Sequence, residues 1–246
     1  MIAVRNLKKR YSLQAGFFAR VGSYVHAVNG VDFTIRDNEV YGLVGESGCG
    51  KTTTARLLVR MVDPSEGEIL FTDRNGIQYP IHAIKRRKLA PVRSKIRYIF
   101  QDPGRSLNPR MQIEQILLYG CRYTPEWPGK QLAREEAAEV MRLVGLSPDD
   151  LNRRPADFSG GQRQRISIAR ALMAKPELLI CDEVVSALDV SIQGQILNLL
   201  LKIRDEYRLS MLFIAHYLSV VSYISDRVGV MYRGMIMEEA PSREIV

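Results

Sequence analysis

The sequence predicts an α/β protein with a mostly parallel sheet, an N-terminal antiparallel β layer and an inserted α-helical subdomain. Helical segments and short apolar strands alternate after residue 159, which is typical of a parallel sheet covered on both faces. Within residues 1–40 apolar and polar side chains alternate instead, as half-buried antiparallel strands require. Residues 103–158 show helical spacing and no convincing strand. We therefore expect one domain over 1–246, with its core at about 1–102 and 159–246 and its helical subdomain at about 103–158.

The first hundred residues predict a strand, a glycine-rich turn and a helix in that order. Every second side chain is apolar over 31–36, and 40–44 is a short apolar strand. The segment 51–62 then has helical spacing of its apolar residues. Further strands are expected at 68–71 and 96–100, separated by a basic excursion.

The rest of the chain continues as helices and strands. The helical subdomain has its clearest apolar spacing at Leu132, Ala137, Val140, Met141 and Val144. Beyond it we expect a helix over 166–173, a strand over 178–181, a helix over 192–203 and a strand over 211–215. Two final strands, 228–232 and 235–239, flank an Arg-Gly pair that indicates a hairpin.

Composition excludes several classes of protein. Hydrophobic residues make up 46% of the chain, which is too many for wholesale disorder. No stretch approaches the roughly 20 apolar residues of a membrane-spanning helix, so any membrane role is expected to be peripheral. Cys49, Cys121 and Cys181 are far apart and odd in number, which suggests neither a disulfide framework nor a clustered metal site and fits a reducing cytoplasm.

The net charge of +8 is compatible with two kinds of partner. It suits a nucleic-acid binder, and it suits equally a protein that holds polyphosphate beside an anionic membrane. The densest basic run, 85–88, has no aromatic residues interleaved for base stacking. We therefore interpret it as a solvated face and expect no nucleic-acid partner.

A glycine-rich phosphate-binding pattern lies between the strand at 40–44 and the helix that follows. Glycines let backbone N–H groups wrap phosphates, and the helix N-terminus adds positive charge. Lys51 would neutralise the β- and γ-phosphates and Thr52 would ligate Mg²⁺. The alternative is a chance glycine-rich turn. The candidate nucleotide-binding residues here are Gly45, Glu46, Ser47, Gly48, Cys49, Gly50, Lys51, Thr52 and Thr53.

Two adjacent carboxylates, Asp182 and Glu183, end the strand expected at 178–181. A buried parallel strand delivers such groups to the carboxyl edge of the sheet, where ligands bind. Asp182 would hold the magnesium ion through a water molecule, and Glu183 would polarise the attacking water as the general base. Taken alone, the pair could also be an exposed turn.

A Ser-Gly-Gly-Gln turn opens the helix at 166–173 and forms a second anion-binding terminus. Its members are Ser159, Gly160, Gly161 and Gln162. One ATP cannot use both this terminus and the loop at Lys51, so the pattern suggests two chains acting together. The alternative is an N-cap with flexible glycines.

In their order and approximate spacing these motifs resemble the nucleotide-binding domains of ATP-binding cassette (ABC) transporters, over nearly the whole chain. The resemblance implies a P-loop NTPase core and a head-to-tail dimer, in which the turn at Ser159 closes over ATP held by the other subunit's Lys51. It also implies that Gln101 senses the γ-phosphate and contributes to the metal site, that His216 contacts the γ-phosphate, and that 186–189, ending at Asp189, contacts the opposite subunit.

The adenine-stacking residue is less certain from the sequence. Tyr11 resembles the aromatic residue that stacks on adenine in this family. Tyr24 and His26 follow an atypical insertion and could serve instead, and a purely structural tyrosine is the remaining interpretation.

The segments 101–103, 106–109 and 185–193 resemble the oligopeptide and dipeptide importer branch. Val184 stands where the family usually has proline, Tyr217 where aspartate commonly follows the histidine, and Phe158 where leucine is usual. None of these departures removes a group that touches phosphate. Importer relatives generally continue into a tail, so we expect a truncated form or a naturally short member.

The expected function is that of an ATPase that uses ATP and Mg²⁺ at the inner face of the cell membrane. Its partners would be a second ATPase subunit, identical or different, two transmembrane permease subunits docked near 103–158, and indirectly a solute-binding protein. The main alternative is a soluble, non-transport cassette ATPase that acts on a macromolecular complex. A regulatory nucleotide-binding module is disfavoured because Lys51, Glu183 and His216 are all present. The transported solute does not follow from the sequence.

Overall fold

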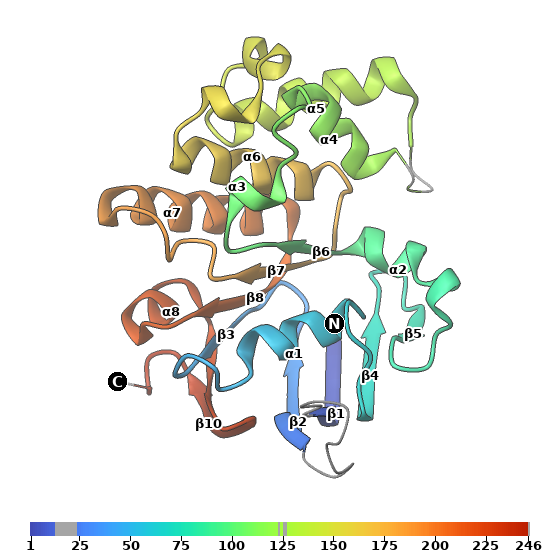
Figure 1. The fold of residues 1–246 in the computed structure, drawn as a ribbon, viewed down its shortest axis with the longest axis vertical. Helices are drawn as coiled ribbons and strands as arrows, with labels where there is room; N and C mark the ends of the chain where they lie inside the picture. Colours follow the sequence, from blue (N-terminus) through green and yellow to red (C-terminus); the bar gives the residue numbers. More distant parts are fainter. Residues whose placement is uncertain (13–23, 123, 125–126, 246) are drawn as a thin grey trace, which may run out of the picture. The chain divides into compact units, whose positions relative to one another are not determined.

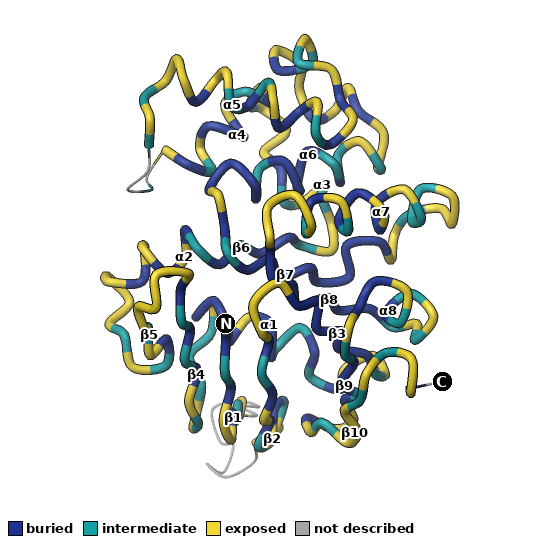
Figure 2. Tube along the Cα trace, turned by 180° about the vertical axis from the view of Figure 1, so that it is seen from behind, coloured by how far each residue is buried: buried dark blue, intermediate teal, exposed yellow. Residues whose placement is uncertain are grey.

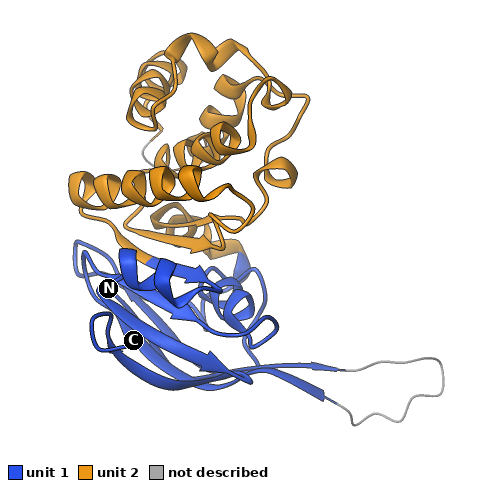
Figure 3. Cartoon of the chain, turned by 90° about the vertical axis from the view of Figure 1, so that its left-hand side faces the viewer, with its two compact units in different colours: residues 1–86, 212–246 blue, residues 87–211 orange. Residues whose placement is uncertain are grey.

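The protein is described by a computed structural model over residues 1–12, 24–122, 124 and 127–245. Its described residues form two compact units, 1–86 with 212–246 and 87–211, which are coloured separately in Figure 3. Helices and strands alternate in sequence, as expected for the α/β class (Figure 1).

The first unit contains the predicted antiparallel layer. Strands β1 (Ile2–Ser12), β2 (Tyr24–Ile35), β4 (Glu66–Thr72) and β5 (Gln78–Pro80) form a sheet in the order β2-β1-β4-β5. All three pairings are antiparallel. Residues on alternate positions of β2 are buried near its end, in agreement with the alternation in the sequence.

The same unit carries part of the second sheet. Strands β3 (Val40–Val44), β8 (Ser210–Ala215), β9 (Arg227–Tyr232) and β10 (Met235–Pro241) follow the order β10-β9-β3-β8. β3 runs parallel to β9, while β9 and β10 form the predicted antiparallel hairpin. β3 is buried along its whole length (Figure 2), because helices and the antiparallel layer leave neither face to water.

Two helices of the first unit differ in how well the sequence predicted them. Helix α1 (Lys51–Leu58) begins as expected but ends before residue 62. The chain turns at Arg60, which has a left-handed φ of 52°, and the Arg60 guanidinium donates to the carbonyl oxygens of Ile81 and His82. The helix itself ends through local backbone bonds: Arg60 N–H donates to the Leu57 carbonyl at 3.0 Å and Met61 N–H to the Arg56 carbonyl at 2.9 Å, the two bonds of a Schellman motif. Helix α8 (Leu218–Ile224), which was not predicted from the sequence, packs near β3 and β9.

The second unit is built on two parallel strands, β6 (Ile96–Ile99) and β7 (Leu178–Asp182). Its helices are α2 (Ala90–Lys95), α3 (Pro103–Ser106), α4 (Ile113–Cys121), α5 (Lys130–Leu143), α6 (Gly160–Leu172) and α7 (Val190–Tyr207). Short 3₁₀ turns cover Arg86–Lys88, Pro148–Asn152 and Pro155–Asp157. No strand occurs in the described residues of 103–158, in agreement with the sequence.

One position in the helical subdomain was assigned wrongly from its spacing. Leu132 was grouped with the apolar face of α5, but its side chain is 54% exposed. Ala133, Ala137, Val140 and Met141 form the buried face instead. Leu132 lies in the first turn of α5 and precedes Ala133, so its side chain points to a different side of the helix from the buried residues. A single exposed leucine of this kind is common on protein surfaces.

None of the helices in the described part of the chain combines the length and apolar character needed to cross a membrane. Cys49, Cys121 and Cys181 are buried with free thiols.

Candidate functional site

The glycine-rich loop of the first unit lies between β3 and α1, the strand-to-helix context that the sequence predicted. Lys51 is 4% exposed, and its Nζ donates to the carbonyl oxygens of Gly45 at 2.6 Å and Glu46 at 2.9 Å. The loop therefore curves around the ammonium group. A cation inside a backbone loop at a helix N-terminus is an arrangement that binds phosphate.

The loop's shape depends on close backbone contacts that only glycine permits. Gly50 caps α1 with φ +114°, and a Cβ there would lie 2.3 Å from the carbonyl oxygen of Ala27. The loop is also supported from the β9–β10 hairpin, where Gly234 N–H donates to the carbonyl of Cys49 at 2.8 Å. Glu46, Ser47 and Gly48 form the exposed tip, whereas Thr52 and Thr53 are half-buried in the first turn of α1.

His216 and the aromatic candidates also belong to the first unit. His216 directly follows β8, which lies beside β3 in the sheet. Tyr11 is exposed near the end of β1, with the Lys9 ammonium 4.9 Å from its ring centroid. Tyr24 and His26 are exposed on the paired strand β2. All three aromatics therefore remain candidates for adenine stacking.

The carboxylates of the second unit lie where β7 ends. Because β6 and β7 are parallel with Ile99 opposite Cys181, Gln101 and Glu183 leave the two strands at the same edge. Glu183 is buried and has a left-handed φ of 52°, an uncommon conformation for a non-glycine residue. Such strained backbone concentrates at functional sites, which supports the catalytic interpretation over an exposed turn.

Ser186 connects the residues at this edge. Its backbone N–H and its hydroxyl both donate to the carbonyl oxygen of Glu183, at 3.1 and 2.9 Å. The amide nitrogen of Gln101 lies 3.5 Å from the Ser186 hydroxyl and donates to it. The sequence predicted Ser186 only as part of an intersubunit contact. Its contact with Gln101 depends on the pairing of β6 with β7, which spacing alone does not reveal.

The Ser-Gly-Gly-Gln turn is a capping box at the start of α6. Ser159 Oγ accepts from Gln162 N–H at 3.3 Å, and Gln162 Oε1 accepts from Ser159 N–H at 2.9 Å. The N-cap interpretation is therefore correct as local geometry. The anion-binding interpretation is compatible with this cap, because Ser159 and Gly160 are exposed and leave the N-terminus of α6 accessible. Asp189 is exposed at the N-cap of α7.

Two departures from the family pattern are accommodated by packing. Phe158 is buried, and the Arg153 guanidinium carbon lies 4.6 Å from its ring centroid. Val184 is buried directly after Glu183. Tyr217, by contrast, is exposed at the N-cap of α8.

Comparisons with known proteins agree with this geometry. Residues 28–186 match the family model described as ABC transporter. The chain belongs to the ABC transporter family. It is the ATP-binding ATPase that the loop, the paired carboxylates and the capped turn predict.

The relatives of this ABC chain include ATP-binding proteins named for transport. It is 45% identical over 246 residues to the oligopeptide transport ATP-binding protein AppF of Bacillus subtilis (strain 168), covering all of this chain and 73% of AppF. It is 46% identical over 245 residues to the glutathione import ATP-binding protein GsiA of Escherichia coli (strain K12), covering 38% of GsiA. Among solved structures, the dimeric ADP- and phosphate-bound ATP-binding cassette MJ0796 superposes with a TM-score of 0.83 at 25% identity, over 99% of both chains.

Proposed function

We propose that this chain is the ATP-hydrolysing subunit of an importer for short peptides, working as a dimer on two permease subunits at the inner face of the membrane. The observation that carries the proposal is the joint presence of an enclosed Lys51 loop and an exposed, capped Ser159 turn. Relatives named for oligopeptide transport and glutathione import support a peptide-type solute. Glutathione is itself a short peptide.

Each residue has a defined part in this proposal. The loop at Lys51 binds the phosphates, and the N-terminus of α6 in a second subunit, at Ser159, closes over the same nucleotide. Glu183 accepts the proton of the attacking water, which Gln101 and His216 help to orient. Tyr11 stacks on the adenine, and Asp189 contacts the facing subunit.

The oxygen-rich donor set fits Mg²⁺. Asp182 supplies a carboxylate, Gln101 an amide oxygen and Thr52 a hydroxyl, which are the hard ligands that this ion prefers. Among the described residues no cluster of three His, Cys, Asp or Glu side chains forms a complete metal site. In this proposal, substrate phosphates and water supply the other ligands of the ion. Bound Mg²⁺ would neutralise charge on the phosphates.

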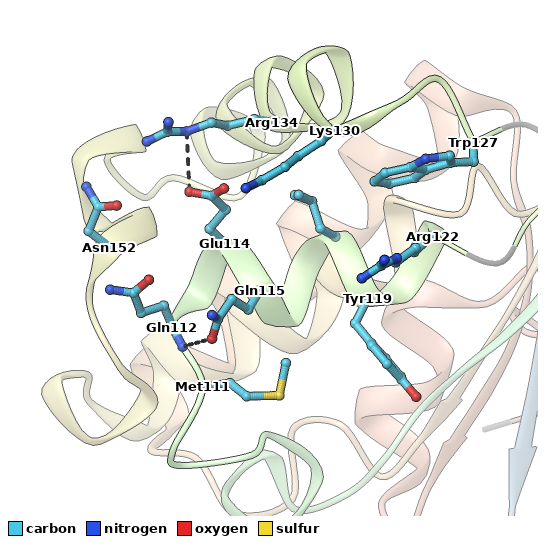
Figure 4. A pocket seen from close by; sticks show the side chains of 11 residues that line it. Met111, Gln112, Glu114, Gln115, Tyr119, Arg122, Trp127, Lys130, Arg134 and Asn152 are labelled. Carbon is cyan, nitrogen blue, oxygen red and sulfur yellow. Dashed lines mark hydrogen bonds and ion pairs between the residues drawn. The ribbon is translucent and has the colours of Figure 1, made fainter.

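A pocket in the helical subdomain provides a surface for the permease. It has a volume of about 1060 Å³ and lies along α4 and α5, with Tyr119 and Trp127 beside it (Figure 4). Its cations are Arg122, Lys130 and Arg134, against one carboxylate, Glu114, already paired with Arg134 at 3.3 Å. A permease segment with apolar and acidic side chains would complement this pocket.

The Glu183→Gln variant tests the ATPase part of the proposal. It should hydrolyse ATP about 10²- to 10⁴-fold more slowly while still binding it, because only the general base is lost. With saturating Mg²⁺-ATP the variant should accumulate as a dimer, measured by light scattering. A monomer that persists under these conditions, in the presence of the permease subunits, would contradict the dimer mechanism.

Charge reversal tests the permease part. Arg122→Glu and Lys130→Glu should weaken copurification with the permease subunits, identified by mass spectrometry. Arg142→Glu is the matched control, since Arg142 is exposed on α5, the helix that carries Lys130, and does not line the pocket. If the wild-type protein recruits no permease and instead stimulates a cytosolic complex, the transport proposal is lost and the ATPase remains.

A further inference from the structure

A buried tyrosine is hydrogen-bonded to the carboxylate that ends β7. The Tyr98 hydroxyl donates to Asp182 Oδ2 at 2.5 Å. Both side chains are buried, at 9% and 5% exposure. A neutral hydroxyl that donates to a buried carboxylate forms a charge-assisted bond, about twice as strong as one between neutral groups.

The sheet explains why these two side chains meet. Tyr98 on β6 is paired with Ile180 on β7 in a parallel register. Side chains of paired residues share a face, and Asp182 is two positions beyond Ile180, so it lies on that face as well. The long tyrosine side chain reaches along the strand to it. The Tyr98 ring is held by Phe100, with ring centroids 4.7 Å apart.

We propose that Tyr98 is a positioning residue for the metal-binding carboxylate of Asp182. The inference rests on the proposed role of Asp182 in holding Mg²⁺. The hydrogen bond restricts rotation of the carboxylate and presents it to the ion in one orientation. Mg²⁺ demands near-ideal octahedral geometry, so a carboxylate that rotates freely binds it less well.

The test is the Tyr98→Phe variant, which removes only the hydroxyl oxygen. The measurement is the Mg²⁺ concentration that gives half-maximal binding of a fluorescent ATP analogue at equilibrium. We expect this concentration to rise about tenfold, the lower end of what loss of a ligand-orienting partner costs in metal affinity. In EDTA, Tyr98→Phe should bind the analogue as well as the wild type does in EDTA, because its phosphate loop is intact.

A second tyrosine–aspartate bond supplies a matched control. The Tyr79 hydroxyl donates to Asp73 Oδ2 at 3.3 Å, in the hairpin between β4 and β5 and away from the residues of the candidate site. Tyr79→Phe should leave the Mg²⁺ midpoint at its wild-type value. If it shifts the midpoint as much as Tyr98→Phe does, the effect is a general loss of stability and the inference is wrong.

Asp182→Asn provides the test of mechanism. If Tyr98 acts through Asp182, adding Tyr98→Phe to Asp182→Asn should cause little further change in the Mg²⁺ midpoint. A full additional tenfold change, or an unchanged midpoint in Tyr98→Phe alone, overturns the inference while leaving the proposed function intact. Wild-type nucleotide binding that is independent of Mg²⁺ would overturn the proposed role of Asp182 and the inference with it.

Discussion

Individual residues of the candidate site are held by short-range contacts that restrict their conformation. Lys51 is enclosed by two carbonyl oxygens of its own loop, and Glu183 has a left-handed backbone secured by two hydrogen bonds from Ser186. A pre-set lysine and glutamate lose less conformational entropy when substrate binds. Rigid residues of this kind suit a site that must stabilise charge in a fixed geometry.

Gly50→Ala should disrupt the phosphate loop. The alanine Cβ would lie 2.3 Å from the Ala27 carbonyl oxygen, and Gly50 has φ +114°, so both the contact and the backbone oppose the change. We expect affinity for a fluorescent ATP analogue to fall at least about tenfold, or about 1.4 kcal/mol. Gly76→Ala is the control, because Gly76 has φ +79° with open space around it and lies in a hairpin turn. Equal binding losses in both variants would contradict this account.

At the scale of elements, burial of one face sets the rotation of a helix about its axis, and local capping sets where it begins and ends. Helix α5 buries Ala133, Ala137, Val140 and Met141 and leaves Leu132 exposed. α6 begins at a capping box, so the Ser159 turn keeps its shape without contacts from another chain. α1 ends early at a Schellman motif in which Arg60 takes the left-handed position usually occupied by glycine.

The register of α5 leads to a paired prediction. Met141→Ala should lower the free energy of unfolding by about 2–5 kcal/mol, because it leaves a cavity in the helical subdomain. Leu132→Ala should change it by no more than about 0.5 kcal/mol, since the side chain is largely in water. Urea unfolding of both variants measures the difference. A large loss in Leu132→Ala would show that α5 packs differently.

Burial also governs the chemistry of Cys121 in α4. Desolvation, with a smaller contribution from Glu136, raises the pKa of its thiol above the ordinary value. The folded state therefore keeps the proton at a pH where the unfolded chain loses it. This contribution to stability is complete below the unfolded pKa, near 9, and is lost as the pH rises through the folded pKa.

Alkylation measures this effect directly. At pH 8.5 we expect Cys121 in the native protein to react with iodoacetamide at least about tenfold more slowly than in urea-unfolded protein, because thiolate and access are both reduced. Peptide mass spectrometry identifies the labelled cysteine. Equal rates in native and unfolded protein would show that α4 opens readily.

At the scale of the whole molecule, the residues and the pocket that we expect to bind a partner lie on the surface. Ser159, Gly160 and Asp189 are exposed, as residues that bind a nucleotide or contact another subunit must be. The pocket along α4 and α5 is open and positively charged. The net charge of +8 would favour approach to an anionic membrane surface, an attraction that salt weakens.

Mixing two inactive variants tests whether one site draws on two chains. Lys51→Ala removes the phosphate-binding lysine, and Ser159→Asp keeps an N-cap residue but places a negative charge where phosphate should bind. Each alone should have less than about a tenth of wild-type ATPase activity, in line with losses on removing a transition-state donor. A mixture should regain activity, because mixed dimers contain one intact Lys51 facing one intact Ser159. Failure of the mixture to regain activity, with mixed dimers demonstrated by tagged pull-down, would place both residues in the same chain's site.

The amino-acid sequence by itself determined the fold class, the phosphate loop, the paired carboxylates and the Ser159 turn. These depend on local rules: glycine at tight turns, apolar periodicity, and polar groups directly after a strand. The bonds between Tyr98 and Asp182 and between Gln101 and Ser186, and the exposure of Leu132, were decided only by the tertiary structure. Each depends on which residues from distant parts of the chain meet in space, and sheet register and packing set those distances.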